Sequence, residues 1–465
     1  MGSSTEDYSK YDNRSKVKKW VDIYEGNPYW ISDNPGEVKV VSRNMAASVA
    51  SELARKVTIE MDSHITGDER AEYLDKQYQR ALGRIRSVVE QLLVQGSAVL
   101  KPFVYNGQIG LEHIRSENFI PLKFNDMGEL VEVVFIDRVT KDSRLYTRLE
   151  THKLDGTDYT ITNKIYLGEG ITPNGISSAE ISLSMVEEWS TLASEVYLEN
   201  IERPLYSYIR TPFANNEDIS SPLGVSVLSK IDGLLRDYDT LYSGLLWEFE
   251  GGTLKVFMAG SLLEDGLNEG DRGKQSGYKR AISTKLVKTL NIDPMSGNSL
   301  IDTFNPAFRV DSYNSAIQSV LRRIEFGAGL GYGDLSEVSQ VDKTAEEIRA
   351  SKERSYSTIV DIQKTLERSL TEVAEVMSII SDLYELGPDS TDEYDLTFHF
   401  DDSIVSTIKT SDKKLEWDIA MAEANSGYIK PEIYLMKRYG VTLEEALDMM
   451  PSKEPEATAN KEPEI

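Results

Sequence analysis

The chain contains no cysteine among its 465 residues and only four histidines, which lie far apart. Without cysteine it has no disulfide scaffold, no thiolate zinc site and no cysteine nucleophile. Because zinc sites draw mainly on histidine and thiolate ligands, the scattered histidines also disfavour a histidine-rich metal centre. We therefore expect no resident metal and no cofactor.

Long apolar runs are also absent, and positive charge is scarce. No stretch approaches the roughly 18 apolar residues that cross a bilayer as a helix, so we expect no membrane contact. The first 14 residues are polar and show no apolar region typical of a secretory signal. The 51 Lys and Arg against 77 Asp and Glu give a net charge of −26. Coating nucleic acid needs a basic surplus, so any DNA contact must be local or must exploit repulsion.

The apolar content, 40% of the residues, is sufficient for folded cores. At 100 to 200 residues per domain, the length predicts about two to four domains. Helical periodicity appears over residues 14–62, and a long charged helix is predicted over 68–96, ending at Gly96. Alternating runs between 98 and 168 predict a mainly antiparallel sheet on these helices, an α+β unit. Its turns are expected at Asn106-Gly107, Asp155-Gly156 and Asn174-Gly175.

Two amphipathic helices and a small insert follow. Residues 221–250 predict one helix of roughly 45 Å that Gly251-Gly252 ends. In the insert, 253–258 and 299–304 are predicted strands and 284–290 is a helix-like stretch. A second helix has its apolar stripe between 313 and 324, and four glycines follow it at 327–333. The segment 334–342 lacks a core pattern and is predicted to be a mobile loop.

The last part of the chain is predicted to be mainly helical. A capping box at Thr344–Glu347 opens the longest helix, about 345–385, which Gly387-Pro388 closes. Residues 394–400 alternate like a strand that adds an edge to the N-terminal sheet. Two or three short helices are expected at 411–450, and the tail 451–465 is expected to be disordered.

Catalytic motifs are mostly missing. Gly270–Gln275 lacks the Ser or Thr and the glycine spacing of a phosphate-binding loop, and Gly329–Gly333 follows no strand, which excludes a dinucleotide site. Three aspartates on one predicted helix are possible carboxylate ligands, but a solvated helix face is the favoured interpretation: Asp232, Asp237 and Asp239. Asp401-Asp402 is better explained as a turn. The sequence predicts no catalytic residues and no enzyme.

Basic residues gather in one stretch of this acidic chain, with no acidic residue among them. They are Arg272, Lys274, Lys279, Arg280, Lys285 and Lys288. A docking or DNA-facing surface and an ordinary solvated loop, balanced by the acidic residues just before it, are about equally supported. Arg322-Arg323 lie off the apolar stripe of their helix, where they would face a neighbouring subunit's carboxylates, solvent or a ligand. The first is favoured in an acidic protein that oligomerises.

The order of these parts resembles the portal proteins of tailed bacteriophages, of the type found in siphophages of Gram-positive hosts. The similarity covers roughly residues 14–450 and rests on an ordered set of stretches. They are Leu93–Pro102 with Asn106–Ile109, Phe119–Leu122 with Asp126–Gly128, Arg203–Pro212, Asn215-Asn216, Ser221–Ser226, Glu248–Glu250 and Thr344–Thr365.

The resemblance implies a portal-like α+β fold and a twelve-fold ring around a DNA channel. Its parts would be as follows: 1–219 the N-terminal part of the wing, 220–252 a stem helix, 253–308 the clip, 309–328 the second stem helix, 329–343 the tunnel loop, 344–410 the long wing helix and return strand, 411–450 the crown and 451–465 the tail. The tunnel loop would bring Tyr332, Asp334, Glu337 and Lys343 toward DNA, with Arg322 and Arg323 nearby. The basic stretch falls on the clip.

The implied function is a channel for packaging and ejecting double-stranded DNA at one capsid vertex, in a virion component assembled in the host cytoplasm. The implied partners are eleven further copies, the terminase large subunit, head-completion or adaptor proteins, the major capsid protein and scaffolding protein. A deletion of residues 332–341 would leave ring assembly intact but impair packaging. The alternatives are a minor head protein without a channel and a metal-dependent phosphodiesterase built from scattered carboxylates.

Overall fold

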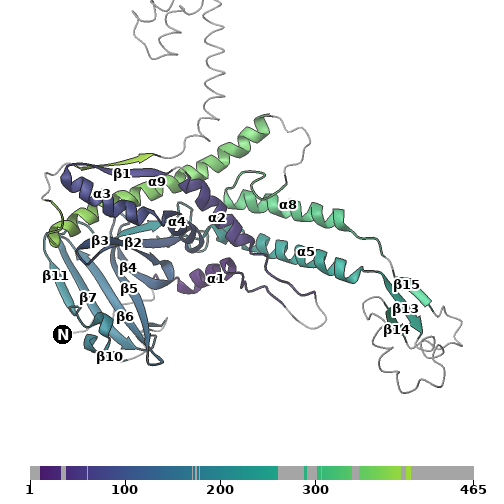
Figure 1. The fold of residues 1–465 in the computed structure, drawn as a ribbon, viewed down its shortest axis with the longest axis horizontal. Helices are drawn as coiled ribbons and strands as arrows, with labels where there is room; N and C mark the ends of the chain where they lie inside the picture. The colour runs from purple at the N-terminus through teal and green to yellow at the C-terminus, as the bar shows by residue number, and fades with distance from the viewer. Residues whose placement is uncertain are drawn as a thin grey trace, which may run out of the picture. The chain divides into compact units, whose positions relative to one another are not determined.

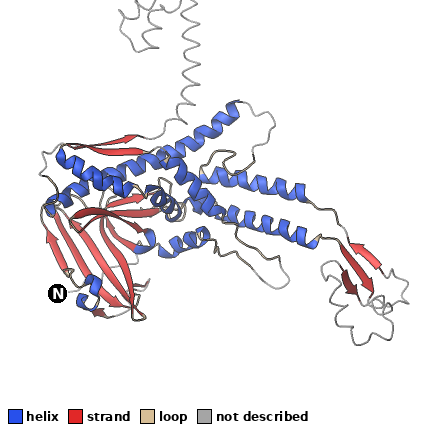
Figure 2. Cartoon of the chain, in the orientation of Figure 1, coloured by secondary structure: helices blue, strands red, loops and turns tan. Residues whose placement is uncertain are grey.

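The computed structural model of the chain describes residues 11–32, 38–59, 61–169, 171–172, 175–176, 179–259, 287–290, 301–304, 306–337, 345–388 and 394–399. The chain divides into two compact units, residues 1–400 and 401–465. The described residues all belong to the first unit, which mixes helices and sheets as the sequence predicts (Figures 1 and 2). The segments 401–410, 411–450 and 451–465, with Asp401-Asp402, lie outside the described residues.

The helical periodicity over 14–62 corresponds to two helices, α1 (Arg14–Tyr24) and α2 (Met45–Thr58). In α1 the side chains of Val17, Trp20 and Ile23 are at most 2% exposed. Their spacing of three residues places them on one helix face, which is the amphipathic pattern of a surface helix. The prediction of helices here is confirmed, although the segment between them is not helical.

The single helix predicted over 68–96 is wrong, because the structure contains two. They are α3 (Glu69–Leu82) and α4 (Ile85–Gln95), separated at Gly83-Arg84. Asp68 caps α3, since its carboxylate accepts a hydrogen bond of 2.8 Å from the Ala71 N–H. Gly96 does end the segment, with φ of 84° in the left-handed region that glycine adopts readily.

A small three-stranded sheet follows, ordered β12-β2-β3. It contains β2 (Ser97–Tyr105), β3 (Gln108–Arg115) and β12 (Ser207–Arg210). The predicted hairpin turn is confirmed, because Asn106 and Gly107 join β2 to β3 with φ of 50° and 71°. Positive φ at both central residues is the geometry of a tight hairpin turn.

The larger sheet is antiparallel, ordered β10-β7-β6-β5-β4, with β11 also paired to β7. Its strands are β4 (Phe119–Phe124), β5 (Leu130–Lys141), β6 (Arg144–Asp155), β7 (Asp158–Leu167), β10 (Glu180–Ile181) and β11 (Glu195–Leu198). The predicted turn at Asp155-Gly156 is confirmed between β6 and β7. Val99, Phe119, Val133 and Tyr206 belong to one buried cluster that joins the two sheets.

Short elements connect these strands. They are the 3₁₀ turns η1 (Ser116–Asn118), η2 (Leu183–Met185) and η3 (Glu187–Trp189), and the small pair β8 (Ile171–Thr172) and β9 (Gly175–Ile176). The turn predicted at Asn174-Gly175 falls partly outside the described residues, since Asn174 is not among them.

The return strand is confirmed, but its expected partner is wrong. Strand β16 (Tyr394–His399) pairs antiparallel with β1 (Asp62–Gly67) and forms a separate two-stranded sheet instead of extending the larger one. Strand β1 was not predicted, because its residues lie between two helical patterns and only Ser63 and Ile65 are buried. Both strands lie beside α3 and α9 (Figure 1).

The helix predicted over 221–250 begins later than expected. The 3₁₀ turn η4 (Val227–Lys230) precedes α5 (Asp232–Gly251), whose 20 residues give a length of about 30 Å. Residues 221–226 are not helical because their polar groups bond elsewhere: the Gly224 N–H donates to Ser97 Oγ, and the Val225 carbonyl accepts from the Thr211 hydroxyl. The predicted end at Gly251-Gly252 is confirmed.

The predicted second helix is α8 (Val310–Ala328), which packs against α5 (Figure 2). Arg309 at its start holds the end of α5 through a two-pronged ion pair with Glu248, at 2.6 and 3.0 Å. Further along, Gly244 of α5 leaves room for the Tyr313 ring, 3.4 Å from where a Cβ would lie. The two helices therefore form one paired rod.

The insert between α5 and α8 contains a three-stranded sheet, ordered β14-β13-β15. Strands β13 (Lys255–Ala259) and β15 (Ile301–Phe304) confirm the two predicted strands. The helix-like interpretation of 284–290 is wrong, because Val287–Leu290 form strand β14, parallel to β13.

The longest described helix is α9 (Ala345–Leu383), as predicted. It packs on β2, β12, α2 and α3. Gln363 of α9 donates to the Val57 carbonyl of α2, and Ser378 of α9 accepts from Arg70 of α3 at 2.8 Å. Helix α9 thus holds together α2, α3 and the small sheet of the N-terminal part. Thr344 of the predicted capping box lies outside the described residues.

Candidate functional site

The segment that follows α8 is the candidate functional site, because it contains most of the predicted loop. It begins at Gly329, which ends α8 with φ of 78°. Glu325, in the last turn of α8, is 2% exposed. Its Oε1 accepts hydrogen bonds from the backbone N–H groups of Gly333, Leu335 and Ser336 at 3.1, 2.7 and 2.7 Å. Its Oε2 accepts from the Ser336 hydroxyl at 2.8 Å.

Two further contacts hold the same segment. Asp334 accepts a hydrogen bond of 2.7 Å from the Gly331 N–H and forms an ion pair of 2.5 Å with Lys56 of α2. The Glu337 N–H donates to the Gln318 side chain of α8 at 2.8 Å. Most of the contacts of residues 331–337 are therefore with α8, and Asp334 in the middle of the segment connects it to α2.

The predicted mobile loop is thus wrong for residues 334–337, since they have a defined conformation with several side-chain contacts. The sequence pattern missed this because the contacts use backbone N–H groups, which leave no apolar periodicity. The rest of the predicted loop, including Lys343, lies outside the described residues. A deletion of residues 332–341 would also remove all four donors to the buried Glu325, so damage to α8 is now the expected result.

The other predicted loop residues lie close to this segment. The Arg322 guanidinium lies over the Tyr332 ring, 5.2 Å from its centroid, and so has a partner within its own chain. Both Arg322 and Arg323 are exposed, as is Glu337. The structure brings together Arg322, Tyr332 and Asp334, while Arg323 and Glu337 face solvent in the single chain.

The predicted basic surface lies almost wholly outside the described residues. Arg272, Lys274, Lys279, Arg280 and Lys285 lie outside the described residues. Lys288 is described only as part of strand β14. The prediction therefore stays a prediction.

The interpretation of Asp232, Asp237 and Asp239 as a solvated helix face is wrong for Asp239. Asp239 is 3% exposed and accepts hydrogen bonds of 2.9 Å from Trp30 Nε1 and from the Arg43 N–H. Burial raises its pKa, although these two donors oppose the shift. Asp232 forms an ion pair with Lys19 at 2.8 Å. Asp232 and Asp239 therefore attach the N-terminal segment to α5, and Asp237 is exposed.

No group of three or more carboxylate or histidine ligands that could hold a metal ion occurs among the described residues. In the same part of the chain, no helix has both the length and the apolar character needed to cross a bilayer.

A buried charged cluster in the larger sheet was missed at the sequence level. Glu150 accepts from His152 Nε2 at 2.6 Å and pairs with Lys101 and Arg148 at 3.1 and 3.0 Å. Burial opposes ionisation, but these partners hold the pKa of Glu150 well below its usual range. Burial lowers the pKa of His152, so its Nδ1 is free to accept from the Tyr159 hydroxyl at 2.7 Å. Within the cluster Glu150 is bonded to His152, Lys101 and Arg148, and only the Arg148 Nε lacks a partner. The cluster joins β6 to β2, which makes it a structural feature.

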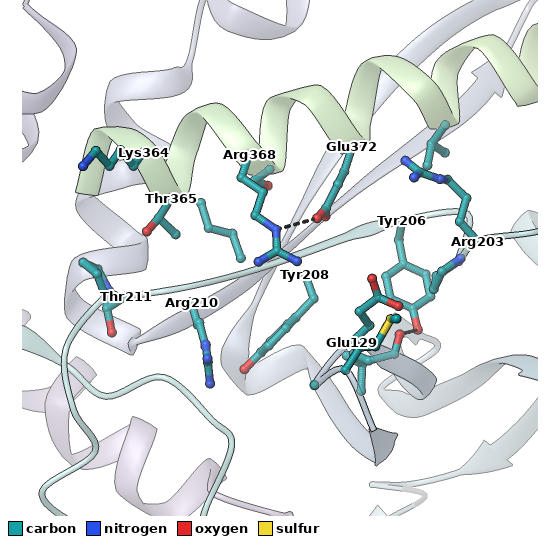
Figure 3. A pocket seen from close by; sticks show the side chains of 18 of the residues that line it. Glu129, Arg203, Tyr206, Tyr208, Arg210, Thr211, Lys364, Thr365, Arg368 and Glu372 are labelled. Carbon is teal, nitrogen blue, oxygen red and sulfur yellow. Dashed lines mark hydrogen bonds and ion pairs between the residues drawn. The ribbon is translucent and has the colours of Figure 1, made fainter. Parts of the chain in front are cut away.

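A groove of about 450 Å³ is lined by residues of α9, of β12 and of the β4–β5 turn (Figure 3). Glu372 lies on its α9 wall, where it pairs with Arg368 at 3.3 Å and accepts from Ser207 at 2.7 Å. Arg203, Arg210 and Lys364 also line it, together with acidic Glu129 and Glu202. Because both charge signs are present, the groove shows no preference for one kind of ion.

A second pocket, of about 560 Å³, lies where the α5–α8 rod meets β13. Its walls include the aromatic side chains of Trp247, Phe257 and Phe308. Phe308 stacks on Phe249 with ring centroids 5.4 Å apart. Trp247, Phe249 and Phe308 are still 55%, 42% and 46% exposed. Clusters of exposed aromatic residues on a rod usually mark a surface that another protein covers.

Comparisons with known proteins show what the chain is similar to. A family model described as "Phage portal protein, SPP1 Gp6-like" matches residues 5–457. A solved structure titled "Neck of native GTA particle computed with C12 symmetry" is similar, with 10% identity and a TM-score of 0.40, over 85% of this chain and 89% of that chain. No curated protein matches.

The match over nearly the whole length places the chain in the class of structural virion proteins of bacteriophages. It belongs to the family of SPP1 Gp6-like phage portal proteins. This family is structural and not enzymatic, in agreement with the prediction of no enzyme and against a phosphodiesterase.

Proposed function

We propose that the chain forms a dodecameric ring at one capsid vertex and that double-stranded DNA passes through the channel of this ring during packaging and ejection. The observation that carries the proposal is the family match across residues 5–457. We further propose a siphophage of a Gram-positive host as its origin, which the sequence resemblance supports.

The α5–α8 rod supports ring formation. A subunit in a ring must cover part of its neighbour by a heterologous contact that closes after a fixed number of copies. The exposed side chains of Leu246, Trp247 and Phe249 offer such a surface on α5. In this proposal 220–252 and 309–328 form the stem, 253–308 the clip, and 1–219 with 344–410 the wing.

The proposed partners follow from this arrangement. The clip would meet the terminase large subunit during packaging and head-completion or adaptor proteins afterwards. The wing would contact the major capsid protein, with scaffolding protein present during assembly in the host cytoplasm. The six basic residues between 272 and 288 would give the clip an acidic partner or a contact with exiting DNA.

The charge balance suits a conduit. Each Lys or Arg that pairs with phosphate increases affinity, so a basic channel would hold DNA back. A chain with a net charge of −26 repels the duplex and permits sliding. In a ring each side chain occurs twelve times, so the exposed Glu337 and Arg323 would become rings of charge.

The mass and shape of the purified protein test the proposal. Twelve chains of 52.3 kDa give about 630 kDa, which native mass measurement would detect and imaging would show as a closed ring with a central hole. A species that remains monomeric at every concentration, also with scaffolding and capsid protein present, would contradict the channel. That outcome would favour a minor head protein instead.

A further inference from the structure

The segment 331–337 has no regular secondary structure, yet side chains bind its backbone. The backbone N–H groups of Gly333, Leu335 and Ser336 all donate hydrogen bonds to one carboxylate, that of Glu325. A carboxylate that accepts several N–H groups makes charge-assisted bonds, roughly twice as strong as neutral ones. One buried side chain therefore holds the backbone of residues 333–336.

A second contact connects the segment to a distant element. Lys56 and Asp334 are 278 residues apart in sequence, and their side chains are only 15% and 20% exposed. Lys56 also lies 3.9 Å from Glu52 of the same helix. Low exposure reduces the screening that makes most surface ion pairs weak.

We propose that Glu325 and Asp334 are positioning residues for the loop that follows α8, and that Lys56 couples this loop to α2. The proposal rests on the proposed portal function, in which the loop borders the DNA channel. Glu325 sets the shape of residues 331–337, and the Lys56–Asp334 pair joins that shape to the wing. A displacement of the loop would then pull on α2.

This assignment changes the expected role of Asp334. The family resemblance implied that it faces DNA, but its carboxylate is occupied by Gly331 and Lys56. Glu337 differs, because its side chain is exposed and only its backbone is held, by Gln318. DNA would therefore meet Glu337, while Asp334 acts through the position of the loop.

The absence of cysteine allows a direct test with a single spin label. In a Glu337→Cys background, the nitroxide should move slowly in the parent protein. Lys56→Ala should raise the mobile fraction about fivefold, as expected for one ion pair of low exposure. Glu325→Ala should release the segment more completely, because the carboxylate that accepts hydrogen bonds from three N–H groups and one hydroxyl is lost. Glu325→Gln keeps an acceptor in place and should have a smaller effect.

Arg55→Ala provides the matched control, since Arg55 is the neighbouring cation on α2 and pairs with Glu52 at 2.6 Å. Because Arg55 makes no hydrogen bond or ion pair with Asp334 and acts on it only through its charge, this change should affect the label far less than Lys56→Ala does. The reversal Lys56→Glu should free the loop, and the pair Lys56→Glu with Asp334→Lys should restore part of the restriction. Equal label mobility in the parent, Lys56→Ala and Glu325→Ala proteins would overturn the proposal.

The functional consequence is measured separately, without the label. Lys56→Glu should form rings of normal mass but lower the amount of DNA packaged, and the double reversal should recover part of it. If no ring forms in the parent protein, the portal function fails while the label result still decides the positioning role. If rings package DNA equally with and without the Lys56–Asp334 pair, the coupling to α2 is wrong and the portal function stands.

Discussion

At the scale of single residues, Asp239 has the most unexpected role. It joins α5 to Trp30, 209 residues earlier in the chain, and to the Arg43 backbone. The sequence places Asp237 and Asp239 on the same predicted helix and cannot tell which of them is buried. That depends on where residues 30–43 pack, which is a long-range property.

Replacing Asp239 by alanine should destabilise the fold. Trp30 Nε1 and the Arg43 N–H would lose their acceptor, and unsatisfied buried donors cost about 1–3 kcal/mol each. Faster hydrogen exchange at residues 38–43 and a lower unfolding temperature would measure the effect. Asp237→Ala, on the exposed side of α5, should change stability by less than about 0.5 kcal/mol. If the two changes lowered stability equally, Asp239 would not hold Trp30 and Arg43 against α5 as described.

His113 should make the fold sensitive to acid. Burial, helped by Arg115, lowers its pKa to about 4 from 6.5. As the pH falls from 6.5 to 4, the unfolded chain binds a proton that the folded chain does not, so folding stability falls by at most about 3 kcal/mol. His113→Leu should flatten the pH dependence of denaturant unfolding in this range. If the pH dependence of stability were the same in His113→Leu, the His113 imidazole would not be desolvated in the folded chain.

His64 gives a control of opposite sign. The hydrogen bond and charge of Asp75 raise its pKa, so it adds stability below its unfolded pKa, and this stability is lost as the pH rises through the folded pKa. His64→Gln should therefore steepen the loss of stability on acidification. If both histidine variants shifted the slope in the same direction, the assignment of their environments would be wrong.

At the scale of elements, periodicity predicted the kind of structure better than its limits. The helices at 14–24, 45–58, 310–328 and 345–383 and the β2–β3 hairpin follow from local patterns. The breaks do not. Residues 221–226 leave the helical path because Gly224 and Val225 bond to Ser97 and Thr211, which no local pattern records.

Within this non-helical segment, the close approach of Gly224 to Gly96 can be tested. A Cβ on Gly224 would lie 1.9 Å from the Gly96 carbonyl oxygen, so the two backbones would have to separate. Gly224→Ala should destabilise the fold by several kcal/mol, on the order of a severe core overpacking. Gly233→Ala is the control, because nothing lies within 4 Å of its Cβ position. It should be neutral or slightly stabilising, and thermal unfolding compares the two.

At the scale of the whole molecule, the exposed aromatics of the α5–α8 rod should matter for assembly. Trp247→Ser should weaken the subunit contact and raise the concentration at which half the chains assemble by about tenfold or more, as for an aromatic hot spot. Tyr105→Ser, at a hairpin turn where the side chain is 69% exposed, is the control. Mass distributions over a dilution series measure both. If the two variants assembled at the same concentration, the subunit contact would not involve Trp247.

The position of the candidate site in the chain was predictable from the sequence, but its ordered conformation and its contacts were not. The glycines around Gly329 correctly located the end of α8 and the start of a loop. Sequence could not show that Glu325, which looks like one more acidic residue of an acidic chain, binds the loop backbone. Nor could it pair Lys56 with Asp334, because ion pairs across 278 residues depend on the fold.

The pairing of β1 with β16 has a consequence for biosynthesis. Asp62 pairs with His399, so one edge of the first unit closes only after nearly 400 residues have been made. Contacts this distant in sequence carry a large loop-closure entropy and form late in folding. A nascent chain would carry β1 as an open edge throughout most of translation, and a truncated product that ends before β16 would keep it. Such fragments should associate with one another, and ribosomes that stall before residue 394 would release an aggregation-prone species.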